Sequence, residues 1–232
     1  GALLENMEIS ARSLGFESKI EIFPQKHISL RLTLGDRVSK ENEIDFYNEI
    51  FSRRTNRKRY DSHPLSQEEK EYIFQDTEKY TNCDLRLVEG SSMKKVAEGL
   101  VVDTIVFLQN KLLHKLLFHE IIQKEKDQRN RHGLYIKTLE MVPPKSFVFR
   151  MLRRWSLAKL ATKVGLLNKI REENIKTIMS SSVVGAILVN DRDLDFMEAG
   201  RLLQRIWLRA TRMKVELQVI TAVPFLWQQL NF

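Results

Sequence analysis

The first forty residues contain one helical and two strand-like patterns of apolar and polar positions. Between residues 18 and 24, and again between 27 and 35, apolar and polar residues alternate, which predicts two strands, the first stopped by Pro24. Before them, Gly15 stands where a glycine commonly ends a helix. The apolar residues that predict this helix recur three and four positions apart: Leu3, Leu4, Met7, Ala11 and Leu14.

The middle of the chain predicts helices around one strand. Ser66 and Glu69 have the spacing of a capping box, ahead of a helix that reaches about Tyr80. The other elements expected here are a helix at 43–53, a strand at 83–90, a helical region at 91–126 and a polar break at 127–133.

The last third of the chain predicts a basic amphipathic region and then a strand, a helix and a second strand. Pro143 and Pro144 precede the basic region, and Asp193 is expected to cap the later helix, which runs to about Met213. The continuous apolar run at 182–190 predicts a fully buried strand, and 215–223 predicts a closing strand. Helices and strands alternate without a regular βαβ repeat, so the expected fold class is mixed α+β.

Residues 1–24 and 200–223 align without gaps. Gly1 matches Gly200, Ala11 matches Ala210 and Glu17 matches Glu216, with apolar residues facing apolar residues between them. Both copies run from a helix opened by glycine into a predicted strand. Chance alignment of two amphipathic helices is the alternative, but because the strands also fall in register we expect two similar halves, the first of them incomplete.

Composition is ordinary for a globular protein, with a formal net charge of +8 that favours anionic partners. Cys83 is the single cysteine, which excludes an intrachain disulfide and fits a cytoplasmic location. No apolar run has the length of a membrane span, and no secretory signal opens the chain. The start at Gly1 and the end at Phe232 give the expectation of a fragment clipped at both ends.

The densest basic cluster is SRRTNRKRY, residues 52–60, in which arginines surround Thr55 and Asn56. Planar guanidinium donors beside a hydroxyl suit a bound phosphate, a nucleic acid or an anionic membrane surface. The sequence has no P-loop and no G-x-G-x-x-G, so a nucleotide site of either type is not expected.

With the later segment AGRLLQRIWLRATRMKVELQVITAVPFL, this cluster resembles the nitroreductase superfamily of flavoproteins, and in particular its tandem-fused, Acg-like branch. The resemblance covers residues 1–24, 50–90 and 182–226 best. It implies a mixed sheet flanked by helices, two fused halves that form a pseudo-dimer within one chain or a homodimer, and bound FMN reduced by NAD(P)H. The electron acceptor would be a small nitro, quinone or similar molecule, and neither nucleic acid nor a membrane span is implied.

The resemblance also implies the residues that hold FMN. Arg53 would contact the polar edge of the flavin ring or the ribityl chain, and Arg54 and Thr55 would hold the phosphate. Arg57 would lie near the ring carbonyls. A segment along the ring would comprise Val219, Ile220 and Thr221. No catalytic side chain is expected, because the isoalloxazine carries the redox chemistry.

The chain departs from the family pattern in two places. Lys214 stands where the family usually has a glycine just after the helix, and VITA replaces a proline-containing turn. The family's Pro-Ser-x-x-Asn loop has no room here, since only Thr81 to Cys83 join the helix and the strand.

Two other groups of residues were weighed for function. His114 and His119 lie five apart on different helix faces and Gln123 stands where a second metal ligand would be needed, so no metal site is expected. Residues 145–176 hold nine basic residues with interleaved aromatic ones. We expect a helical lid over the flavin, with membrane or nucleic-acid docking as the alternative.

The predicted organisation is a remnant of a first half at 1–40 and a second half at 41–232, with 135–180 as a lid or insertion. The predicted function is an FMN-dependent oxidoreductase. The alternatives are a flavin-storage protein of the same fold and a basic docking module.

Overall fold

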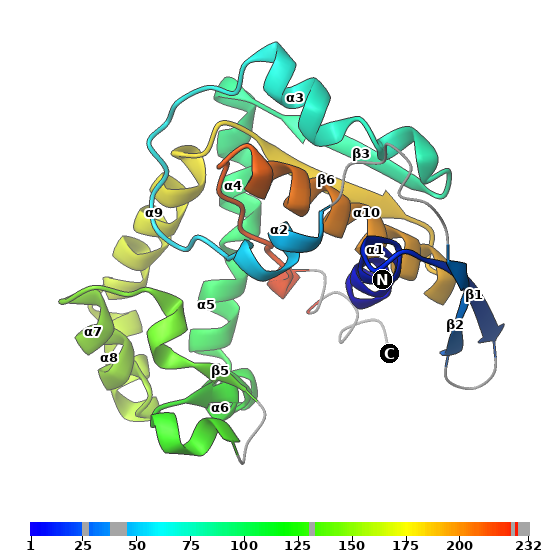
Figure 1. The fold of residues 1–232 in the computed structure, drawn as a ribbon. Coiled ribbons are helices and arrows are strands. Elements are labelled where there is room, and N and C mark those ends of the chain that lie inside the picture. Colours follow the sequence, from blue (N-terminus) through cyan, green and yellow to red (C-terminus); the bar gives the residue numbers. More distant parts are fainter. Residues whose placement is uncertain (25–27, 38–45, 130–132, 224–225, 227–232) are drawn as a thin grey trace. The chain divides into compact units, whose positions relative to one another are not determined.

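The computed structural model describes residues 1–24, 28–37, 46–129, 133–223 and 226 (Figure 1). The expected α+β class is confirmed. The chain forms two compact units, each of which we describe by itself. The first unit contains residues 1–56, 65–87 and 185–217, and the second contains residues 57–64, 88–184 and 218–232.

The first unit is built around a long helix that is buried on two sides. This helix, α10 (Asp193–Arg212), packs Leu202, Ile206 and Ala210 toward α3 and the strands β3 and β6, and packs Leu208 toward α1 and α2. Figure 1 shows α10 lying along β6. The other elements of this unit are α1 (Ala2–Ser13), β1 (Phe16–Pro24), β2 (Ile28–Arg37), α2 (Tyr47–Ser52), α3 (Gln67–Phe74), the 3-10 helix η1 (Thr77–Lys79), β3 (Cys83–Val88) and β6 (Val184–Val189).

The local signals in the first half of the chain gave elements close to those observed. The two alternating segments form an antiparallel hairpin, in which Ser18 pairs with Leu34. The capping box is present, since Ser66 Oγ accepts from the Glu69 amide and the Glu69 carboxylate accepts from the Ser66 amide. Of the helix predicted at 43–53, residues 43–45 lie outside the described residues, and the helix begins at Tyr47.

The second unit is mainly helical. Its helices surround an apolar cluster formed by Leu108, Phe118, Leu152, Ala158, Ala161 and Leu167. Its elements are η2 (Gly90–Ser92), α4 (Met93–Leu100), α5 (Val102–Gln109), α6 (Lys111–Glu120), β4 (Ile121–Ile122), η3 (Glu125–Arg129), β5 (Leu134–Tyr135), η4 (Ile136–Leu139), α7 (Lys145–Leu152), α8 (Trp155–Lys163) and α9 (Leu166–Met179).

The helical region predicted at 91–126 is interrupted. Asn110 is extended and its Oδ1 accepts from the amides of Leu112 and Leu113, so it caps a new helix instead of continuing the old one. After Glu120 the chain leaves the helix, because Ile121 and Ile122 pair in parallel with β5.

Three further expectations need correction. Residues 184–189 form a strand, but none of them is fully buried, since one face packs on α10 while Leu188 on the other is 52% exposed. Asp193 does not cap α10: the N-cap residue is Arg192, and the carboxylate that receives hydrogen bonds there belongs to Asp195. In place of one mixed sheet, the described residues form three two-stranded sheets.

Candidate functional site

The arginine-rich segment leaves α2 and runs beside the chain that follows α10. The Arg53 amide still donates to Glu49 O (2.9 Å), but Arg53 itself is extended and ends the helix. Thr55 then forms a parallel bridge with Leu217, and the Asn56 amide donates to Leu217 O over 3.1 Å. Two segments about 160 residues apart in the sequence, both of which carry the family resemblance, are therefore neighbours in space.

The end of α10 directs the chain toward this bridge. Lys214 has a φ of +59°, its amide donates to Thr211 O (3.0 Å), and the Val215 amide donates to Ala210 O (2.8 Å). This pair of hydrogen bonds around a left-handed residue is the Schellman motif, which usually has glycine at that position. Lys214 thus adopts a backbone conformation that glycine commonly has just after a helix.

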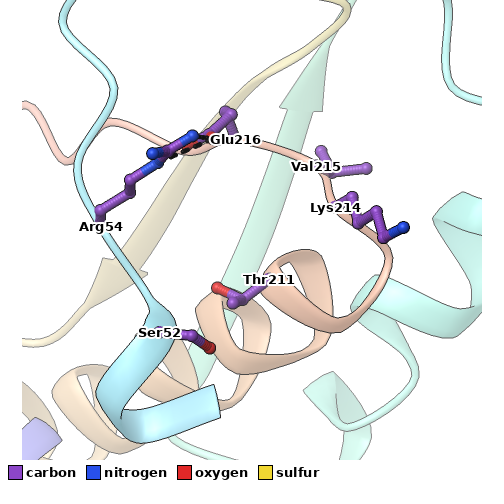
Figure 2. Close-up of a pocket in the computed structure, with 6 residues that line it drawn as sticks. All are labelled: Ser52, Arg54, Thr211, Lys214, Val215 and Glu216. Carbon is purple, nitrogen blue, oxygen red and sulfur yellow. Dashed lines mark hydrogen bonds and ion pairs between the residues drawn. The ribbon is translucent and has the colours of Figure 1, made fainter.

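Arg54 is joined to Glu216 across the two segments. Its Nε lies 3.0 Å and its Nη2 2.7 Å from the same carboxylate oxygen, Oε1 (Figure 2). The Arg54 side chain is 78% exposed, and exposed ion pairs contribute about 0–1 kcal/mol. An anionic ligand with better geometry can therefore replace Glu216 as the partner of Arg54.

A cavity of about 340 Å³ opens beside this pair. Figure 2 shows the residues that line it: Ser52, Arg54, Thr211, Lys214, Val215 and Glu216. The hydroxyls of Ser52 and Thr211 donate to carbonyls within their own helices, so they offer the cavity lone pairs and not protons. The cationic donors are Arg54 and Lys214. The volume is at the low end for ligand sites and suits a phosphate with part of its chain more than a whole flavin.

Arg53 contributes a buried donor without an acceptor. Its guanidinium carbon lies 4.2 Å from the centre of the Trp207 ring, a cation–π contact. Among the described residues its buried Nε has no hydrogen-bond partner, and burial lowers the pKa of the guanidinium. Buried donors are almost always satisfied, so this unpaired Nε is an exception among the described residues.

The remaining predicted site residues belong to the second unit. Arg57 is engaged there: its amide donates to Glu140 Oε2 and its Nη1 donates to Thr138 O, both over 2.8 Å. Val219, Ile220 and Thr221 are irregular, so the strand predicted at 215–223 is wrong beyond the single bridge at Leu217. The structure thus brings Arg53, Arg54 and Thr55 together in the first unit.

Sequence reasoning missed most of the cavity lining. In the sequence, Lys214 stands out only as a departure from the family pattern, and Glu216 only because it aligns with Glu17 in the internal repeat. Ser52 and Thr211 carry no signal of their own, because each side chain reaches the cavity only through the end of its helix.

Metal and membrane sites were also sought in the structure. Within the described ranges, no three His, Cys, Asp or Glu residues gather as potential metal ligands. In the same part of the chain, no helix combines the length and apolarity needed to cross a bilayer. His114 is a buried core residue whose Nε2 donates to Leu152 O over 2.8 Å.

The chain matches no protein-family model, no curated protein and no solved structure.

Proposed function

We propose that this chain is an FMN-binding oxidoreductase of the nitroreductase type, which reduces nitro, quinone or similar acceptors with NAD(P)H. One observation carries the proposal: the Thr55–Leu217 bridge joins the two segments on which the resemblance rests. Around that bridge lie a cavity with two cationic donors and the Arg53 guanidinium, whose buried Nε lacks an acceptor among the described residues.

The residues present fit the polar parts of FMN. Arg54 and Lys214 would hold the phosphate, with Glu216 displaced, since charge-assisted hydrogen bonds contribute about 1.5–3 kcal/mol each and the exposed pair they replace contributes less. Arg53 Nε would donate to a ribityl or ring oxygen, held in position by Trp207. When bound, the isoalloxazine supplies the redox chemistry.

We propose further that α1 and α10 are equivalent elements of two duplicated halves. In the alignment Glu5 matches Gln204 and Asn6 matches Arg205. Glu5 accepts from Arg205, and Asn6 Oδ1 accepts from Gln204 Nε2 over 2.6 Å, so each contact is the reciprocal of the other. Such reciprocity is the property of a two-fold interface.

Two other features support equivalence of these helices. A Cβ on Gly200 would lie 3.0 Å from the Cα of Gly1, and a Cβ on Gly1 would lie 2.7 Å from the Cα of Gly200, so the aligned glycines meet where the helices approach. Gly15 and Lys214, which are also aligned, both have positive φ just after their helices.

The test is a titration of the chain with FMN, followed by quenching of flavin fluorescence. We expect saturable binding that Arg54→Ala weakens by about 10- to 100-fold, the loss of one or two charge-assisted bonds. Arg86→Ala is the matched control, because Arg86 is an equally exposed arginine paired with a carboxylate, Asp84, in the same unit. Absence of saturable binding, or equal affinity in both variants, contradicts the proposal.

The bound complex then separates an enzyme from a flavin-storage protein. An oxidoreductase loses its visible flavin absorbance when NADH or NADPH is added under anaerobic conditions. A storage protein retains that absorbance.

A further inference from the structure

The proposed flavin site leaves a second basic segment of the chain without a role. Residues 150–169 contain six arginines and lysines and no aspartate or glutamate, against a formal net charge of +8 for the whole chain. The segment contains the end of α7, all of α8 and the start of α9, and it belongs to the second unit. This stretch is therefore one of two strongly basic segments of the chain, the other being residues 52–60.

These six cations have no acidic partners among the described residues. They are Arg150, Arg153, Arg154, Lys159, Lys163 and Lys169, and all are exposed. The contrast is with Lys145 and Lys176 at either side, which both pair with Glu173, as does Arg59. Positive charge left exposed and unneutralised in this way provides an attractive surface for a polyanion.

Large apolar side chains lie exposed on the same faces. On α7, Phe147 is 64% and Met151 42% exposed. At the other helix, Leu160 is 53% exposed, and Val164, just after its last turn, is 69% exposed. Each pair has i, i+4 spacing, so the two members of a pair share a helix face.

The opposite faces of both helices are committed to the core. Val148, Phe149 and Leu152 of α7 and Ala158 and Ala161 of α8 pack in or against one apolar cluster. Because both helices cover that cluster, their outer faces are turned away from it. We call the outer residues Phe147, Arg150, Met151, Arg154, Lys159, Leu160, Lys163 and Val164 the α7–α8 outer face.

We propose that the α7–α8 outer face docks on the surface of an anionic lipid bilayer, with its apolar side chains inserted between headgroups and its cations on the lipid phosphates. Interleaved Lys/Arg and large apolar residues on one side of a helix are the composition of interfacial helices. The proposal concerns the bilayer surface and is independent of flavin binding.

The charge and chemistry of the α7–α8 outer face favour an anionic bilayer over a second copy of the chain or a nucleic acid. A second copy of the chain would bring the same six cations against these six, which is repulsive. A nucleic acid would satisfy the cations, but single-stranded ligands stack on aromatic side chains, and of the exposed apolar residues on this face only Phe147 is aromatic while Met151, Leu160 and Val164 are not. An anionic bilayer suits both kinds of side chain, because its phosphates pair with the cations and the acyl chains beneath them bury the aliphatic side chains.

Cosedimentation with vesicles tests the proposal. We expect the chain to bind vesicles of phosphatidylcholine mixed with phosphatidylserine, and to remain in solution with phosphatidylcholine alone. Arg150→Gln with Lys163→Gln should weaken binding by about 25-fold, at about fivefold per cation. Phe147→Ser with Leu160→Ser should weaken it by about tenfold or more, although charge is unchanged.

The matched control removes two exposed lysines elsewhere in the same unit. Lys94→Gln with Lys95→Gln on α4 lowers the net charge equally and should change binding by less than about twofold. Equal loss in the control, or full binding by the Phe147→Ser, Leu160→Ser variant, overturns the proposal. Tight binding of duplex DNA or RNA at physiological salt also overturns the proposal, if the wild-type chain and the Phe147→Ser, Leu160→Ser variant bind it equally well. Unchanged circular dichroism shows that each variant is folded.

Discussion

The guanidinium carbon of Arg53 lies 4.2 Å from the centre of the Trp207 ring, while its buried Nε has no partner in the part of the chain that the structure describes. The Trp207 ring thus holds in place an Arg53 Nε–H that has no acceptor among the described residues. In a residue kept only for stability this would be a cost of about 1–3 kcal/mol.

Arg53→Met separates ligand binding from stability. Methionine keeps the packing on Trp207 and removes the unpaired donor, so we expect the free energy of unfolding to stay the same or rise by about 1 kcal/mol. FMN affinity should fall at least tenfold. Urea unfolding and FMN titration measure the two quantities, and a large loss of stability would mean that the guanidinium serves the fold.

Lys214→Gly should stabilise the chain. Lys214 holds a φ of +59° at the end of α10, which costs a non-glycine residue about 1 kcal/mol. We expect a gain of about that size in the free energy of unfolding, and a similar loss for Gly15→Ala at the end of α1. Lys214→Ala is the control, because alanine removes the lysine side chain but keeps a Cβ at the positive φ. An equal gain in the free energy of unfolding for this variant would mean that the lysine side chain, and not the backbone conformation, causes the change.

Asp76 should make the first unit sensitive to acid. Burial alone would raise the pKa of Asp76, but hydrogen bonds from Lys79 and Arg209 outweigh it and hold the pKa below its ordinary value of 3.8. A lowered carboxyl pKa gives stability that is present above pH 3.8 and is lost as pH falls through the folded-state value. The stability difference between wild type and Asp76→Ala should therefore shrink in acid.

At neutral pH, Asp76→Ala leaves Arg209 buried without its carboxylate, which lay 2.7 Å from Nε. We expect a loss of about 3 kcal/mol. The double change Asp76→Leu, Arg209→Met removes both charges and should cost less than Asp76→Ala. A double variant that is less stable than the single one would contradict this account of the pair.

Cys83 should be a slow thiol. Burial, and then the carboxylates of Glu198 and Asp195, raise the pKa of the Cys83 thiol from 9.0 to about 11. Two pKa steps reduce the thiolate at pH 8 about a hundredfold, and the thiolate is the reactive form. Alkylation by iodoacetamide should be slower by about that factor in the folded chain than in urea. Similar rates in both conditions would exclude the raised pKa.

Exchange of residues between α1 and α10 tests the reciprocity of their contacts. Glu5→Gln with Gln204→Glu leaves Arg205 facing an amide and sets a carboxylate against Asn6, at a cost of about 3 kcal/mol. Adding Asn6→Arg and Arg205→Asn restores a charged pair and an amide pair in exchanged places. Arg201 also donates to Glu5 and keeps only Glu8 as a partner in the fourfold variant, so thermal unfolding should show that this variant recovers part of the loss. If it is no better than the twofold one, the two positions are not equivalent.

The elements that the sequence predicted well are those whose causes are local. Ser66 and Glu69 satisfy each other's amides within one turn, and the 16–37 hairpin follows from alternation on adjacent strands. Gly15 ended α1 as expected. In these cases the residues that decide the structure are neighbours in the chain.

The predictions that failed depended on distant residues. The segment after α10 is rich in β-branched residues, which favour a strand. In the structure only Leu217 of this segment pairs, with Thr55, so the strand predicted from propensity does not form. The run at 184–189 is apolar enough for a buried strand, yet only one face meets α10. The cavity forms where the ends of α2 and α10 lie close together. Nothing in the sequence around Arg54 or around Glu216 predicts that these two side chains pair.

The division of the first unit along the chain constrains how the protein is made. Helix α1 is synthesised ~180 residues before α10, the helix that buries Glu5, and translation of that interval takes roughly 10 to 40 s. During this time the second unit can emerge from the ribosome complete through α9, while Ile9 of α1 still lacks Leu208 of α10, against which it packs in the folded chain. Nascent chains stalled before residue 193 should therefore bind chaperones through α1, and release should coincide with the synthesis of α10.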